Sequence, residues 1–191
     1  TALDGASARY LVRRNNTPWS DFAAPVSAGR SAAINAVAVS GNDVFVGGTY
    51  STIGGRPMNN IARWNRTSAA WSMLGTDTAN GVNGDVYAIR VLGDRVFVGG
   101  FFGVAGNVPA RNIASFSISQ QRWEALAESS DPSREGTDGA VQALAVDPAM
   151  GSVYAGGAFT IAGADTVLGM AQVKTGTQEW VKIDDALDVP Y

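Results

Sequence analysis

The most restrictive feature of the sequence is a repeat of about 52 residues that runs through nearly the whole chain. A Gly-Gly pair ends an apolar run in three copies, at residues 47–48, 99–100 and 156–157, with spacings of 52 and 57 residues. A tryptophan keeps the same spacings and adds one earlier copy: Trp19, Trp71, Trp123 and Trp180. Repetition with this period is typical of arrays in which one small structural unit stacks on the next.

Each full copy predicts four short strands, termed a to d. In one copy the apolar, β-branched or aromatic runs are 86–91, 95–100, 112–116 and 123–126, separated by Gly, Asn, Asp or Ser. Tight-turn sequences at 40–43 and 92–95 join strand a to strand b. No segment shows a 3.6-residue period over ten positions, which excludes a helical solenoid. The chain is therefore predicted to be all-β, a β-propeller of about 3.5 four-stranded blades.

The blades are predicted within a single partial propeller domain that spans residues 1–191. Their approximate ranges are 1–24, which has strands c and d only, 34–75, 86–127 and 141–182. An incomplete ring leaves unpaired strand edges, which invite pairing with more chain. We therefore expect either a longer polypeptide with two to four further blades, or copies that associate edge to edge. The start inside a blade favours the longer polypeptide.

The repeat resembles the kelch family. Its marks are strand b ending in Gly-Gly, then an aromatic residue in strand c and a tryptophan in strand d, here Trp64 with Trp71 and Phe116 with Trp123. Val173 replaces the aromatic residue in the last copy. The longer string 44–55, continued by 59–64, is similar to repeats of Rax2-like cell-surface proteins. This resemblance implies a propeller outside the cell or on its surface, and leaves the activity open because propellers host binding, scaffolding and catalysis.

Composition excludes several kinds of chemistry. The chain has no cysteine and no histidine, which excludes a thiol nucleophile, a disulfide, a Ser-His-Asp triad and a Cys- or His-bound metal. The formal net charge is −3 and no basic stripe is present, which argues against nucleic-acid binding. No apolar run reaches the roughly 18 residues of a membrane span. We predict no cofactor, no metal and no membrane span in this segment.

Two repeated motifs are expected to be structural. The Gly-Gly pairs lack the lysine and the helix of a phosphate-binding loop, so they should let neighbouring backbone approach. The regular recurrence of the tryptophans predicts packing rather than sugar stacking. Asp131, Glu135 and Asp138 lie in one connection without the spacing of a calcium loop, and a solvated loop is the favoured interpretation.

The long connections predict the binding face. Connections b–c and d–a share one face of a propeller, and here they are 51–59, 75–85, 103–111 and 127–140. Binding residues concentrate on long loops held by a rigid scaffold. If the chain has a binding face, the candidate residues for a protein or glycan partner are Arg56, Asn59, Asn107 and Arg111; ordinary polar loops are the favoured interpretation.

Two N-glycosylation sequons begin at Asn15 and Asn65, both in the predicted turn between strands c and d. We predict that they carry glycans if the protein is secreted by a eukaryote, and are plain turn residues otherwise. The favoured function is a non-enzymatic extracellular or cell-surface interaction or structural module. The alternatives are a carbohydrate-binding propeller and a glycan-active enzyme that depends on carboxylates.

Overall fold

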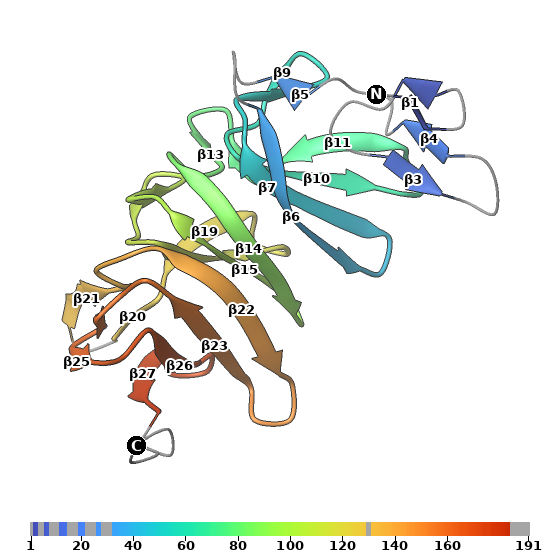
Figure 1. Cartoon of the computed structure of the whole chain (residues 1–191). Helices are drawn as coiled ribbons and strands as arrows, with labels where there is room; N and C mark the ends of the chain where they lie inside the picture. The colour runs from blue at the N-terminus through green and yellow to red at the C-terminus, as the bar shows by residue number, and fades with distance from the viewer. Residues whose placement is uncertain are drawn as a thin grey trace.

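The computed structural model describes residues 32–128 and 131–183, together with the backbone of five short strands before residue 32. Every regular element in these parts of the chain is a β-strand, which confirms the all-β propeller prediction. Three four-stranded antiparallel sheets are arranged as an open fan (Figure 1). The first strand of each sheet, strand a, contacts the strand a of the next sheet, and these strands form the inner side of the fan.

Each sheet is a meander in which strand a pairs with b, b with c, and c with d. Two-residue turns join a to b at Gly41–Asn42 and Gly93–Asp94, as the sequence predicts. The strands are β6 (Ala33–Ser40), β7 (Asp43–Thr49), β10 (Ile61–Asn65) and β11 (Ala70–Met73); β14 (Asp85–Leu92), β15 (Arg95–Phe101), β18 (Ile113–Ser117) and β19 (Arg122–Ala125); and β22 (Val141–Asp147), β23 (Ser152–Gly157), β26 (Met170–Lys174) and β27 (Glu179–Lys182).

The long connections fold into short hairpins instead of irregular loops. Those between strands b and c are β8 (Thr52–Ile53) with β9 (Arg56–Pro57), β16 (Val104–Ala105) with β17 (Val108–Pro109), and β24 (Ile161–Ala162) with β25 (Asp165–Thr166). Those between d and a are β12 (Gly75–Thr76) with β13 (Ala79–Asn80), and β20 (Ala127–Glu128) with β21 (Asp131–Glu135).

The strands before residue 32 are short. β3 (Val12–Arg14) pairs with β4 (Trp19–Asp21) at the place expected for strands c and d of the first copy. β1 (Ala2–Leu3) pairs with β2 (Ala6–Ser7), and β5 (Val26–Ser27) pairs with β8.

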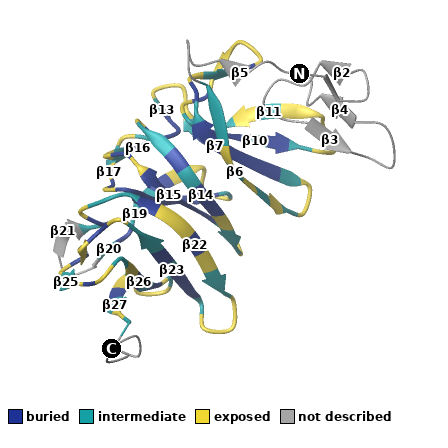
Figure 2. Cartoon of the chain, in the orientation of Figure 1, coloured by how far each residue is buried: buried dark blue, intermediate teal, exposed yellow. Residues whose placement is uncertain are grey.

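The hydrophobic core lies between successive sheets. Figure 2 shows buried residues concentrated on middle strands such as β10 and β15. Trp123 and Trp180 are buried, and the indole nitrogen of each donates 2.9 Å to a carbonyl of the preceding sheet or its exit, Leu74 and Leu126 respectively. These two tryptophans therefore pack as predicted, and each joins two sheets through a buried hydrogen bond.

The Gly-Gly pairs are places of close approach. A Cβ at Gly99 would lie 2.6 Å from Cγ1 of Val141, in the next sheet. A Cβ at Gly100 would overlap the carbonyl oxygen of Asp85, in the neighbouring strand. The first glycine thus allows the next blade to approach closely, and the second allows strand a of the same sheet to do so. This confirms the structural role of the pair.

Candidate functional site

One face of the fan carries all the hairpins of the long connections, and backbone pairing ties these hairpins to neighbouring sheets. Val82, in the connection after β13, forms an antiparallel bridge with Ala105 of β16. Thr137 forms the equivalent bridge with Ala162 of β24. Each d–a connection therefore pairs with the b–c hairpin of the following sheet. We name this surface the hairpin face, and its hairpins are held by backbone hydrogen bonds at both ends.

Two asparagines strengthen these junctions. Asn60 and Asn112 precede strand c with φ of 62° and 65°, a left-handed conformation that asparagine tolerates better than most residues. Their side-chain nitrogens donate 2.9 Å to the carbonyls of Val82 and Thr137. The third copy has Gly169 at this position, with φ of 73° and no side chain to make the bond. An alignment of the three copies shows that glycine replaces asparagine here, but only the structure shows which carbonyls the two asparagines bond.

Further polar side chains cap the next hairpin. The side-chain oxygen of Asn83 accepts hydrogen bonds from the amides of residues 103 and 104, both 2.9 Å long. Asp138 does the same for the amides of Thr160 and Ile161, at 2.7 and 2.8 Å. The hydrogen bond from the Ile161 amide is the main reason that the pKa of Asp138 lies below its usual value. Asp138 is thus a structural cap, whereas the side chain of Asp131 lies outside the described residues.

The residues predicted for binding lie at the tips and bases of two successive hairpins. Arg56 in β9 and Asn107 in the β16–β17 turn are exposed near the tips. Asn59 and Arg111 occupy equivalent positions at the bases, where both are exposed. Asn59 donates 3.2 Å to the carbonyl of Asn80, and Arg111 donates 3.3 Å to that of residue 135. The four side chains are therefore spread along the hairpin face, two on each hairpin.

The sequon asparagine Asn65 ends β10 and is half-buried, while residues 66–70 of the following turn are exposed. Its side-chain nitrogen donates 2.7 Å to Asp43, and its oxygen accepts 3.1 Å from the amide of Thr67. The second N–H of the Asn65 side-chain amide forms no hydrogen bond with a residue that the structure describes. The other sequon residue, Asn15, lies outside the described residues.

Two hollows lie near the inner strands, and the sequence did not predict them. The first has a volume of about 510 Å³ and is lined by Asn83, Gly84, Asp85, Phe101, Phe102, Gly103 and Asn112. The second, of about 290 Å³, lies between the strands a of three sheets, β6, β14 and β22; the residues used below are Asn35, Tyr87, Arg90 and Gln142. Several residues that line the hollows differ between the aligned copies of the repeat, and this difference is the sequence signal that could have identified them.

Sequence comparison shows the family of the chain. The model of the Rax2 C-terminal beta propeller domain matches residues 15–135, more than half of the chain. The chain belongs to this family. No curated protein matches the sequence of this Rax2-family propeller.

Two solved structures similar to this Rax2-family propeller are computationally designed proteins. Ika4 aligns over 83% of this chain and 76% of its own, with 18% identity and a TM-score of 0.51. Ika8 aligns over 82% of this chain at 18% identity and a TM-score of 0.50, and the chain spans 37% of the length of Ika8. At this identity the likeness concerns the fold alone.

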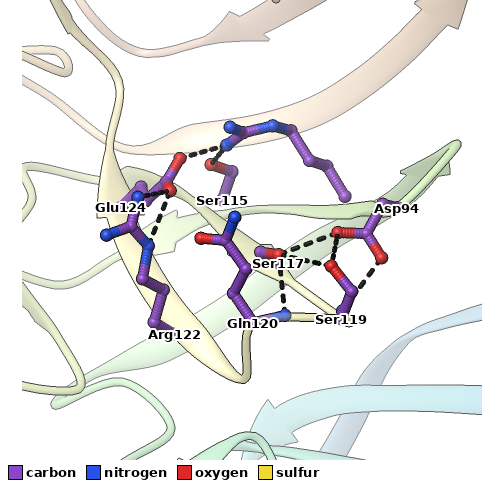
Figure 3. A network of polar contacts seen from close by, with 8 residues as sticks. Asp94, Ser115, Ser117, Ser119, Gln120, Arg122 and Glu124 are labelled. Carbon is purple, nitrogen blue, oxygen red and sulfur yellow. Dashed lines mark hydrogen bonds and ion pairs between the residues drawn. The ribbon is translucent and has the colours of Figure 1, made fainter.

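The opposite surface of the Rax2-family propeller carries the a–b and c–d turns, and several of its polar side chains form hydrogen bonds with one another. Figure 3 shows a network on the middle sheet in which Glu124 accepts a hydrogen bond from Arg122. Arg95 donates another hydrogen bond to Glu124. Asp94 accepts 2.8 Å from the hydroxyls of Ser117 and Ser119. Burial raises the pKa of Glu124, but the two arginines outweigh it and hold this pKa below the usual value.

Neither a metal centre nor a membrane helix is found in the part of the Rax2-family propeller that the structure describes. No three acidic side chains come together there as metal ligands. Nor do the same residues contain a helix long and apolar enough to cross a membrane.

Proposed function

We propose that this Rax2-family propeller is a non-enzymatic interaction module outside the cell or on its surface. A propeller domain suggests a protein-interaction module, and the hairpin face is the observation that carries the proposal. Its hairpins are bound to neighbouring sheets through Val82 and Thr137, while Arg56 and Asn107 stay exposed near the tips. A surface that is already ordered loses little conformational entropy when a partner binds.

The side chains on the hairpin face suit a protein partner. Arginine is enriched at the energetic centres of protein interfaces, since its planar group makes several hydrogen bonds. Arg56 forms no ion pair with any residue the structure describes, so its charge is available to a partner. Arg111 lies one blade further along the same face and contacts the backbone of residue 135. An acidic or hydrogen-bonding protein surface that spans two blades would engage both arginines.

Two hydrogen-bonded carboxylates of the fold have pKa values that do not suit a general acid. A general acid must be protonated near the working pH, which requires a raised pKa. Burial opposes ionisation of Asp43, but hydrogen bonds from Arg63 and Asn65 lower its pKa overall. Asp138 also has a lowered pKa, through the hydrogen bond from the Ile161 amide. These carboxylates stabilise the fold in ionised form. Turnover of a glycoside by the full-length protein would contradict this part of the proposal.

Proximity labelling tests the proposed interaction. The full-length protein is displayed on cells with a fused peroxidase, and the labelled proteins are compared between the wild type and the double variant R56E/R111E. We expect at least a tenfold loss of one defined set of labelled proteins, because the charge on the hairpin face is reversed. Gln120→Glu, in the turn on the opposite face, is the matched control and should keep the set. An identical set from the double variant would refute the hairpin face as the interface.

Cell-surface location has a separate test. An antibody that cannot enter cells should detect a tag on the full-length protein in intact cells. Signal only after permeabilisation would contradict the location and leave the interface result standing.

A further inference from the structure

The three inner strands share a β-bulge at one position of the repeat. The register of β6, β14 and β22 against their partners skips Asn35, Tyr87 and Gln142, one residue in each strand. A bulge leaves one residue unpaired and redirects its side chain, and bulges are common beside binding sites. All three bulge residues line the hollow of about 290 Å³ between the inner strands. The fold therefore presents three different polar side chains at one place.

The polar groups in this hollow retain unused hydrogen-bonding capacity. Asn35 donates 3.0 Å to the carbonyl of Val86 and keeps its side-chain oxygen as an acceptor. Arg90 donates 2.8 Å to the carbonyl of Ile89 and keeps its other donors. The side chain of Gln142 has no hydrogen bond to a described residue, so its amide group can both donate and accept. The hollow thus offers donors and acceptors side by side.

The hollow of about 510 Å³ adds an aromatic surface and a carboxylate. Phe101 is 62% exposed, and it lies opposite Asp85 in the pairing of β14 with β15. Asp85 accepts 2.8 Å from the hydroxyl of Thr49, which leaves further acceptor positions on its carboxylate. The Tyr87 hydroxyl donates to the same carboxylate at 3.4 Å. Tyr87 lines one hollow and Asp85 the other, so this hydrogen bond links the linings of the two hollows.

The repeat itself indicates that packing does not require these side chains. At the position of Phe101 the other two sheets have Thr49 and Ala158. At the position of Arg90 they have Ala38 and Ala145. The same strand geometry therefore forms with small residues at both places. Packing alone does not explain an exposed phenylalanine and an arginine that has no acidic partner among the described residues, both in the middle sheet.

We infer that the two linked hollows bind a neutral, hydroxyl-rich glycan. A sugar ring has a face of C–H groups that stacks on an aromatic ring such as Phe101, and neighbouring hydroxyls that each donate and accept hydrogen bonds. Asp85 and Asn35 provide acceptors, and Arg90 provides donors. Asp85 and Arg90 have opposite charges, so a neutral ligand leaves no net charge uncompensated. The inference does not depend on the protein partner proposed for the hairpin face, since it uses none of the four residues predicted there.

A glycan array probed with the purified chain tests the inference. The probes are neutral oligosaccharides of hexoses and N-acetylhexosamines, with uronate oligosaccharides and an acidic peptide as comparisons. We expect saturable binding of neutral glycans only. Phe101→Thr and Arg90→Ala install the residues of a neighbouring blade, so both should fold, and we expect each to weaken binding at least tenfold. Phe101→Trp should keep binding, because it preserves the stacking surface.

Arg56→Ala on the hairpin face is the matched control and should bind the glycan like the wild type. Thermal unfolding checks that each variant is folded. If Phe101→Thr is unfolded, the glycan binding of Arg90→Ala serves as the test. Three results would overturn the inference: no binding of neutral glycans, binding that neither variant weakens, or binding of the anionic probes alone. None of these results bears on the protein partner, because R56E/R111E tests that partner separately.

Discussion

Gly99 is a residue at which two neighbouring sheets lie very close together. A Cβ there would be 2.6 Å from Val141, whereas the equivalent Gly156 has its nearest atom 3.9 Å away. Neither glycine has a positive φ, so alanine is tolerated by the backbone at both positions. The two glycines therefore separate the effect of packing from the effect of backbone conformation.

We expect Gly99→Ala to lower the free energy of unfolding by about 1–3 kcal/mol, because the new methyl group overpacks the boundary between two sheets. Gly156→Ala is the matched control and should change the stability of this chain by less than about 0.5 kcal/mol. Urea denaturation followed by tryptophan fluorescence measures both. Equal effects of the two variants would contradict a packing role for Gly99.

Asn112 combines a left-handed backbone with a bond that joins two blades. Asn112→Gly keeps the backbone and removes the bond to Thr137, so it should cost about 1–2 kcal/mol. Asn112→Ala should cost roughly 1–2 kcal/mol more, because a residue with a Cβ and no polar side chain is disfavoured at this φ. Denaturation gives both values, and an alanine variant as stable as the glycine variant would exclude backbone strain.

At the scale of elements, the surface that carries the a–b and c–d turns depends on ionised carboxylates that connect strands b, c and d. Glu124 on β19 bonds Arg95 on β15, and Asp43 on β7 forms an ion pair of 2.7 Å with Arg63 on β10. The pKa values of Glu124 and Asp43 lie below the usual values. Such groups stabilise the fold at pH values above the pKa of the unfolded chain, about 4, and this contribution is lost as the pH falls through the lower folded pKa.

We therefore expect the melting temperature of the chain to be nearly constant from pH 7 to 5 and to fall below about pH 4. Glu124→Gln should lower the melting temperature at pH 7 and reduce the further loss on acidification, since one ionising group is gone. Glu179→Gln is the control, because its pairing with Lys174 at 3.3 Å is exposed and contributes little. Calorimetry over this pH range measures the effect, and an unchanged acid profile in Glu124→Gln would contradict it.

At the scale of the whole molecule, the two end sheets of the fan expose apolar residues at positions that are buried in the middle sheet. Val37 and Val39 on β6 are 47% and 59% exposed, whereas Ile89, the equivalent of Val37 in the next sheet, is fully buried. At the other end Met170 is 38% exposed, although its equivalent Ile113 is fully buried. A further sheet of the same repeat would cover both surfaces, and a longer chain or a second copy remains our proposal for its source.

We predict that the 191-residue chain alone associates through these ends. Light scattering at increasing concentration should give a mass above that of one copy. The double variant V37K/V39K should shift the species towards the monomer, because lysine ammonium groups resist burial in an apolar contact. Gln120→Lys, in an exposed turn, should leave the mass unchanged. A wild-type chain that stays monomeric at high micromolar concentration would contradict the prediction.

The sequence by itself determined the features that depend on local pattern and repetition. Alternating apolar runs and tight-turn residues specify the strands, and recurrence with one period specifies a propeller. Recurring Gly and Trp residues pack between blades because every blade meets the next in the same way, as Gly99 and Trp123 show. The sequence predicted which long connections share one face, but it did not show that these connections fold into hairpins.

Only the tertiary structure decided which separated residues meet. Asn112 reaches Thr137 across a blade boundary, and Asp85 meets Phe101 through the register of two strands. The bulges that bring Asn35, Tyr87 and Gln142 to one hollow have no local sequence mark, because a bulge is a mismatch between two strands and belongs to neither alone. Local propensity specifies each strand, but contacts between distant residues arise only when the sheets pack, and binding surfaces are made of such contacts.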